Sequence, residues 1–157
     1  MKTLINIFDA QFKKLHERSE ELVKKISPDK LFWKPDEMKE IYTMFSFGEF
    51  ILRSAGAVEQ TFGGITVKLW DDPFEWSLPE ELSTSGKILD YLREVEQTRQ
   101  NGFGYFISDK DLYKEIPAPE KLTTIAELLI ETIARAEHFQ GRAFAVFQTF
   151  SGKKSVS

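Results

Sequence analysis

The segment "SFGEFILRSAGAVEQTFGGI", residues 46–65, decides the fold that the sequence predicts. It opens with a capping box: the Ser46 hydroxyl can accept a free backbone N–H, and Glu49 can reach back to the Ser46 N–H. Steps of three and four then place apolar side chains on one face of a helix. These side chains are Phe47, Ile51, Ala55, Val58, Phe62, Ile65 and, just beyond the segment, Leu69. The segment therefore predicts an amphipathic helix that begins at Ser46.

Three further segments carry the same helical period. One runs from about residue 3 to residue 26, one begins near Thr84, and one opens with a second capping box, "TIAE", at residues 124–127. Their apolar faces consist of Phe8, Phe12, Leu15, Ser19, Leu22 and Ile26; of Ile88, Leu89, Leu92, Val95 and Phe103; and of Ile125, Leu128, Leu129, Thr132, Ala136, Phe139, Ala143, Phe147 and Phe150. The chain thus predicts four helices, each with one face to bury.

The connections between these helices are long and contain proline and aromatic residues. They read "SPDKLFWKPDEMKEIYTMF", "WDDPFEWSLPEEL" and "ISDKDLYKEIPAPEKL". No strand-like alternation competes with the helices, although the β-branched run "GITVKLW" leaves a strand open at the end of the second one. We predict an all-α fold for residues 1–157: one four-helix-bundle domain with long connecting loops, an ordered core over about residues 3–150, and a loose tail "SGKKSVS".

Composition excludes several classes of function. The formal net charge is −4 and no Lys/Arg-rich block occurs, so we expect neither a nucleic-acid partner nor a membrane partner. The chain has no cysteine, which excludes disulfides, thiolate metal ligands and a cysteine nucleophile. Its N-terminus turns polar too soon for a signal peptide, and no apolar run reaches the roughly 18 residues of a membrane span. We expect a soluble cytoplasmic protein.

Two of the predicted helices carry a second face of small and isolated polar residues. On the fourth helix this face lies nearly opposite the apolar face, and on the second helix it lies off the apolar face. Its members are Glu127, Glu131, Ala134, His138 and Ala145 on the fourth helix, and Arg53, Ala57, Gln60 and Gly64 on the second. A face of this kind is typical of a solvated surface, of a close helix contact, or of the floor of a ligand site. The sequence leaves these alternatives open.

Metal ligands are scarce, because His16 and His138 are the only histidines. A site of His138 with Glu131 and either Glu49 or Glu59 can be drawn, and a metal needs at least three such ligands. A lone helical histidine is more commonly a surface or hydrogen-bonded residue. We place His16 on a charged surface face that it shares with Lys13, Lys14, Glu17 and Arg18.

The remaining motifs carry little chemistry. "FGGI" lacks the spacing of a phosphate loop, and no nucleophile elbow is present. The segment "LWDDPFEW", residues 69–76, fits a clamp for a cation or an aromatic ligand. It fits better an aromatic plug buried over the end of the bundle.

Three segments resemble the DinB-like superfamily: "SPDKLFWKP" at residues 27–35, "SFGEFILRSAGAVE" at 46–59 and "ETIARAEHFQGRA" at 131–143. The resemblance extends over about residues 3–150 and implies a DinB/YfiT-like four-helix bundle that forms a homodimer. Members of this superfamily hold a divalent metal with three histidines, one in the second helix and two in the fourth. Related proteins are S-transferases and isomerases that use a low-molecular-weight thiol such as mycothiol or bacillithiol.

The three histidine positions of the superfamily fall on Arg53, Ala134 and His138 of this chain. A guanidinium keeps its proton and puts positive charge where the metal would sit. The resemblance therefore implies a degenerate metal site, with His138 as its one surviving ligand and zinc or nickel as the candidate ion. We expect Arg53 to form an ion pair with Glu131 or Glu137, or alternatively to bind a small anionic ligand together with His138.

These observations leave three functions open. The first is a non-catalytic protein that binds a small ligand or acts as an accessory protein, without a cofactor. The second is a metal-dependent thiol S-transferase of the bacillithiol or mycothiol type that uses replacement ligands. The third is a structural dimeric interaction module, which predicts a filled interior between Arg53 and His138.

Overall fold

The computed structural model describes residues 1–34, 45–71 and 82–151. Within these ranges the protein is mostly helical, so the all-α prediction is confirmed. Four long helices account for most of the chain: α1 (Thr3–Lys25), α2 (Phe47–Val67), α3 (Ser85–Gly104) and α4 (Ile125–Ser151). Two predictions concern segments that lie largely outside the described residues: the loose tail "SGKKSVS" and the aromatic plug "LWDDPFEW" at residues 69–76.

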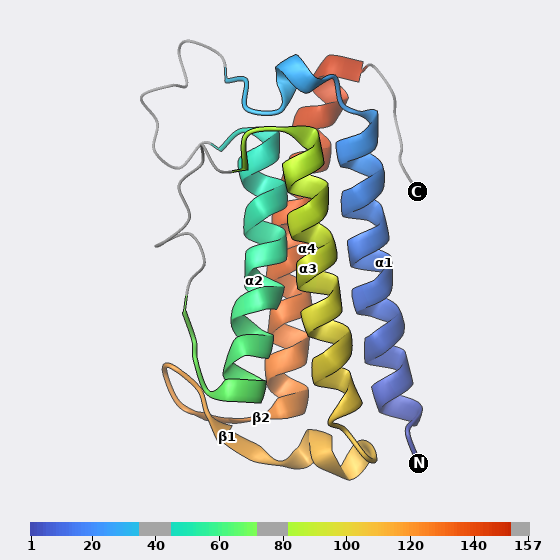
Figure 1. Ribbon diagram of the computed structural model, residues 1–157. Coiled ribbons are helices and arrows are strands. Elements are labelled where there is room, and N and C mark those ends of the chain that lie inside the picture. The colour runs from blue at the N-terminus through green and yellow to red at the C-terminus, as the bar shows by residue number, and fades with distance from the viewer. Residues whose placement is uncertain (35–44, 72–81, 152–157) are drawn as a thin grey trace.

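The four helices lie side by side, with α1 and α4 running in one direction and α2 and α3 in the other (Figure 1). The helix α2 packs on α3 and α4, and α1 packs on the same two helices, so that α1 and α2 face each other diagonally. The helices α2 and α3 are parallel, so the end of α2 and the start of α3 lie at opposite ends of the bundle. This explains why the connection is longer than a tight helix-to-helix turn.

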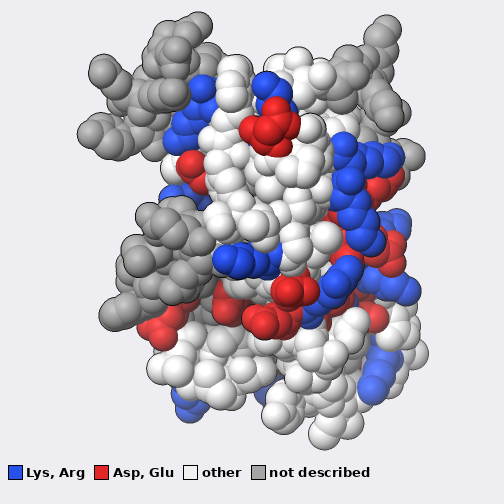
Figure 2. All heavy atoms as spheres, turned by 45° about the horizontal axis from the view of Figure 1, so that its top comes forward, with Lys and Arg blue, Asp and Glu red and all other residues white. Residues whose placement is uncertain are grey.

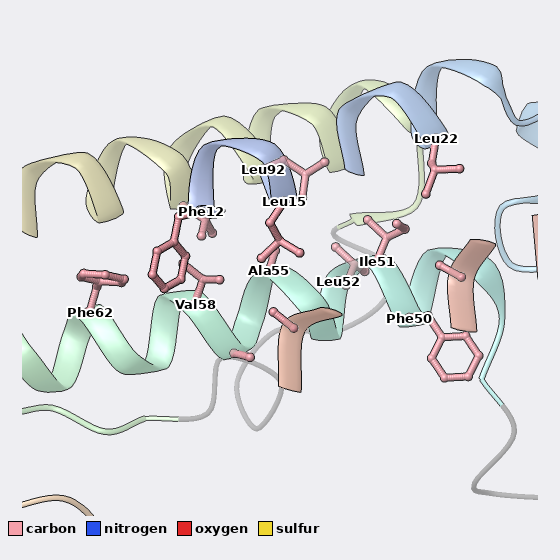
Figure 3. Packing of buried hydrophobic residues seen from close by; sticks show 14 of the residues in the cluster. Phe12, Leu15, Leu22, Phe50, Ile51, Leu52, Ala55, Val58, Phe62 and Leu92 are labelled. Carbon is pink, nitrogen blue, oxygen red and sulfur yellow. The ribbon is translucent and has the colours of Figure 1, made fainter. Parts of the chain in front are cut away.

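The core lies among the four helices, and Figure 3 shows Phe12 and Leu15 of α1 and Leu92 of α3 beside the α2 residues that it labels. The rings of Phe12, Phe62 and Phe103 meet with centroids 5.5–5.8 Å apart. A Cβ on Gly102 would lie 2.6 Å from the Phe62 ring, so glycine at this position lets α2 and α3 approach. Aromatic packing and close helix approach thus depend on each other here.

Both predicted capping boxes are half formed. The Ser46 and Thr124 hydroxyls accept hydrogen bonds from the backbone N–H groups of Glu49 and Glu127, at 3.3 and 3.1 Å. The carboxylate of Glu49 lies 3.3 Å from the Lys34 ammonium, and that of Glu127 accepts from the Thr123 hydroxyl at 3.1 Å. The hydroxyl half of each box is therefore confirmed, while each glutamate carboxylate binds another side chain.

The first turn of α1 is capped by a residue that is remote in the sequence. Lys2, at the N-cap position, makes no side-chain cap. The two carboxylate oxygens of Asp109 accept from the backbone N–H groups of Leu4 and Ile5, each at 3.1 Å. Asp109 begins the short helix η5 (Asp109–Tyr113), which follows α3. A carboxylate at a helix N-terminus also interacts favourably with the helix dipole, so this contact fastens α1 to the chain after α3.

Two details differ from the sequence-based expectation. The second helix ends at Val67, where Lys68 takes the left-handed conformation (φ 59°), so Leu69 leaves the helix and is exposed. The run "GITVKLW" is helical up to that point. A small hairpin, β1 (Glu115–Pro117) and β2 (Leu122–Thr124), pairs antiparallel before α4 and was not predicted. Strands of three residues are too short for alternation to be visible in a sequence.

Candidate functional site

Beside the second face of α2, two small hydroxyl residues bind α4. The Ser54 hydroxyl donates to the Ala136 carbonyl at 2.8 Å, and the hydroxyl oxygens of Thr61 and Thr132 lie 2.6 Å apart, all in the buried interior. Ala57 is buried as well. Gly64 is also buried, so the solvated-surface interpretation is wrong for the small residues of this face.

The corresponding face of α4 is a solvated surface. Glu131, Ala134 and His138 are all exposed. The His138 ring contacts the ring of the adjacent Phe139, with the two ring centroids 5.7 Å apart. The surface interpretation of this face is confirmed.

Arg53 is half-buried, and its guanidinium lies 4.0 Å from the centre of the Phe45 ring. This is the geometry of a cation–π contact. Glu137, one of the two expected partners of Arg53, instead receives two hydrogen bonds from the guanidinium of Arg18 on α1, at 3.0 and 3.2 Å. Among the ion pairs of the described residues, none joins Arg53 to Glu137 or Glu131: Glu137 pairs with Arg18 of α1, and Arg53 lies against the Phe45 ring.

The three positions that the resemblance assigns to a metal do not form a ligand set. Within residues 1–34, 45–71 and 82–151, no group of three His, Cys, Asp or Glu side chains is placed to hold a metal ion. Arg53 brings a permanent positive charge and Ala134 brings no donor atom, so His138 is the one ligating side chain of the three. The described residues do not fit a divalent metal at this position.

A pocket of about 270 Å³ opens between the last turns of α2, the turn of the hairpin and the first half of α4. It is lined by Gln60, Thr61, Trp70, Ala118, Pro119, Glu120, Lys121, Thr123, Leu128, Glu131 and Arg135. Two of the candidate residues, Gln60 and Glu131, belong to this lining, whereas Arg53, Ala57, Ala134 and His138 do not. The candidate site is therefore shifted along α2 and α4 from the position that the sequence indicated.

One wall of the pocket is the indole of Trp70, held by three features of the chain. The left-handed residue Lys68 reverses the backbone after α2. A Cβ on Gly64 would lie 2.3 Å from the indole, so glycine lets the ring lie directly on the helix. The Gln60 amide then donates to the Trp70 carbonyl at 3.0 Å. The Trp70 wall is built into the end of α2.

The rest of the lining carries charges of both signs. Glu131 and Arg135 are one turn apart on α4, and Glu120 and Lys121 form the hairpin turn, in which the Ala118 N–H donates to the Lys121 carbonyl at 3.0 Å. None of the four forms an ion pair with another residue of the described ranges. We name Glu120, Lys121, Glu131 and Arg135 the charged quartet. The spacing of Glu131 and Arg135 was visible in the sequence, but the hairpin that faces them was not.

A second polar cluster lies between α1 and α3, and it includes His16, which the sequence analysis had placed on a charged surface. His16 does not lie on a charged surface: its side chain is 15% exposed and lies between two carboxylates, 2.5 Å from Glu20 and 3.9 Å from Glu96. Burial by itself would raise the pKa of Glu20, but the charges of His16, Lys24 and Arg93 outweigh it and lower that pKa. The i, i+4 spacing of His16 and Glu20 was the available signal.

Arg99 completes this cluster. Its side chain is 1% exposed and is bound by Asp9 of α1 and by Glu96 of its own helix. The guanidinium also lies 5.2 Å from the centre of the Phe103 ring. We name Asp9, His16, Glu20, Glu96 and Arg99 the α1–α3 ionic cluster; because its charges bind one another, it links two helices rather than offering a site.

Figure 2 shows Lys and Arg intermixed with Asp and Glu on the face that it draws. Among the described helices, none combines the length and the apolar character that crossing a membrane requires. Comparisons with protein-family models, with curated proteins and with solved structures returned no match to this chain.

Proposed function

We propose that the protein is a DinB-like four-helix bundle with a degenerate metal site, and that it acts as a non-catalytic protein that binds a small ligand. The observation that carries the proposal is the placement of Arg53, whose guanidinium lies 4.0 Å from the Phe45 ring at a position where the superfamily has a histidine. A fixed positive charge there disfavours a cation.

The pocket supports ligand binding over a purely structural role. It lies between α2 and α4, which also carry the candidate residues of the sequence analysis, and two of these residues, Gln60 and Glu131, line it. Trp70 gives it a preformed aromatic wall. Ligand sites are concave, are largely preformed, and combine apolar walls with a few polar groups. The homodimer implied by the resemblance remains part of the proposal.

Elemental analysis of tag-free protein tests the proposal, before and after incubation with zinc or nickel, beside the variant His138→Ala. We expect less than stoichiometric metal in both proteins. About one metal per chain, lost in His138→Ala, would overturn the degenerate site and favour the thiol S-transferase.

A variant that restores the ligand set sharpens this test. Arg53→His together with Ala134→His returns three histidines to the positions of the resemblance. We expect this double variant to bind zinc, because three imidazoles complete the protein's share of an open zinc site. Failure of the double variant to bind metal would argue against the DinB-like correspondence itself.

A further inference from the structure

The charges in the pocket point to a particular class of ligand. An anion alone would meet the carboxylates of Glu120 and Glu131, and a cation alone would meet Lys121 and Arg135. A neutral apolar ligand would remove water from four charges and offer them nothing in return, which is unfavourable. A ligand that carries both signs can bind both halves of the charged quartet.

The walls restrict the ligand further. At about 270 Å³, the pocket is close to the lower end of the range for ligand sites, about 300–1,000 Å³. The Trp70 indole offers an aromatic face that attracts an ammonium group. Leu128 and Pro119 add apolar surface for a short side chain. These properties fit a small molecule with an ammonium, a carboxylate and a modest apolar part.

We propose that this pocket binds a small zwitterion of the α-amino-acid type. Its carboxylate binds Arg135 and Lys121, and its ammonium binds Glu131 beside the Trp70 ring. The inference deepens the proposed ligand-binding function and rests on it, but it does not depend on the metal-free state of the position around His138. Metal binding there and zwitterion binding here are therefore separable results.

Isothermal titration calorimetry of the full chain with each of the common L-amino acids tests the proposal. The comparison compounds are the carboxamide of the best binder, which lacks the carboxylate charge, and its N-acetyl derivative, which lacks the ammonium. We expect each comparison compound to bind at least about 10-fold more weakly than the zwitterion, since each loses one charge-assisted interaction. Equal binding of either compound, or no binding of any amino acid, would overturn the proposal.

Two variants assign the charges. Arg135→Gln should weaken binding of the amino acid at least about 10-fold. It should leave binding of the carboxamide unchanged, because the carboxamide already lacks the contact with Arg135. Glu131→Gln should weaken binding of the amino acid by a similar factor and leave binding of the N-acetyl derivative unchanged. Both side chains are exposed, so neither change threatens folding.

Matched controls separate the pocket from general charge effects. Arg142→Gln on α4 and Glu94→Gln on α3 change the same residue types at exposed positions outside the pocket lining. We expect both to bind the amino acid as the unmodified chain does. If the controls weaken binding as much as Arg135→Gln and Glu131→Gln do, the zwitterion does not bind in this pocket.

Discussion

The interface between α1 and α3 and the interface between α2 and α4 use polar residues in opposite ways. Between α1 and α3, the ionic cluster holds charges that bind one another, such as the buried Arg99 with Glu96 and with the more exposed Asp9. Between α2 and α4, buried contacts are made by small hydroxyl residues, such as Ser54 and Thr132, while the charged quartet lies at the edge without ion-pair partners in the described chain. Charges that bind each other hold helices together, and charges without such partners remain available to a ligand.

The largest effect should follow from breaking the α1–α3 ionic cluster. Arg99→Ala leaves the carboxylate of Glu96 without its main partner, and loss of one member of a buried pair costs about 3–5 kcal/mol. Urea unfolding followed by circular dichroism measures this loss. The control Arg93→Ala removes an exposed pair with Glu20 and should cost at most about 1 kcal/mol. Equal costs for the two variants would show that burial of Arg99 contributes nothing to stability.

A smaller effect is expected at the α2–α4 contact. Thr132 donates its one hydroxyl hydrogen to the Leu128 carbonyl at 2.7 Å, so Thr61 must be the donor in the Thr61–Thr132 pair. Thr132→Val leaves the buried Thr61 hydroxyl unpaired and should cost about 1–3 kcal/mol in unfolding free energy.

The double variant Thr61→Val with Thr132→Val checks this reasoning. It removes both hydroxyls, so we expect it to be closer to the unmodified chain than the sum of the two single changes. Strict additivity in urea unfolding would mean that the two hydroxyls, 2.6 Å apart, are not coupled.

The smallest effect concerns pH and tests whether Glu20 is stabilised as a charge. Its pKa is lowered by folding, so its contribution to stability is present above the unfolded value, 4.5, and is lost as the pH falls through the folded pKa. Glu20→Gln should therefore flatten the dependence of unfolding free energy on pH below 4.5, by less than about 1 kcal/mol. A Glu20→Gln curve with the original slope would contradict the role assigned to Glu20.

Local rules predicted the helices well. The hydroxyls of Ser46, Thr84 and Thr124 cap α2, α3 and α4, because a cap depends on atoms only three residues apart. The apolar period likewise predicted which residues form the core, such as Phe12 and Phe62. Helix propensity, capping and amphipathic period are properties of neighbouring residues, so the sequence contains them directly.

The candidate site was predicted only in part, for a physical reason. A helical wheel gives the direction of a side chain but not the neighbour that it meets, so it separated His138 from the core yet left the partner of Arg53 open. The pocket depends on a three-residue hairpin and on the reversal at Lys68, which bring Lys121 and Trp70 to α4. Such encounters join segments about 50 residues apart and have no local signal.

The sequence by itself determined an all-α chain of capped amphipathic helices, because hydrophobic period and backbone hydrogen bonding are settled within a few turns. The tertiary structure alone decided that α2 and α3 run parallel, that His16 lies between carboxylates of α1 and α3, and that the charged quartet and Trp70 line one pocket. These features depend on which helix faces meet, and that choice minimises the free energy of the whole packed chain rather than of any one segment.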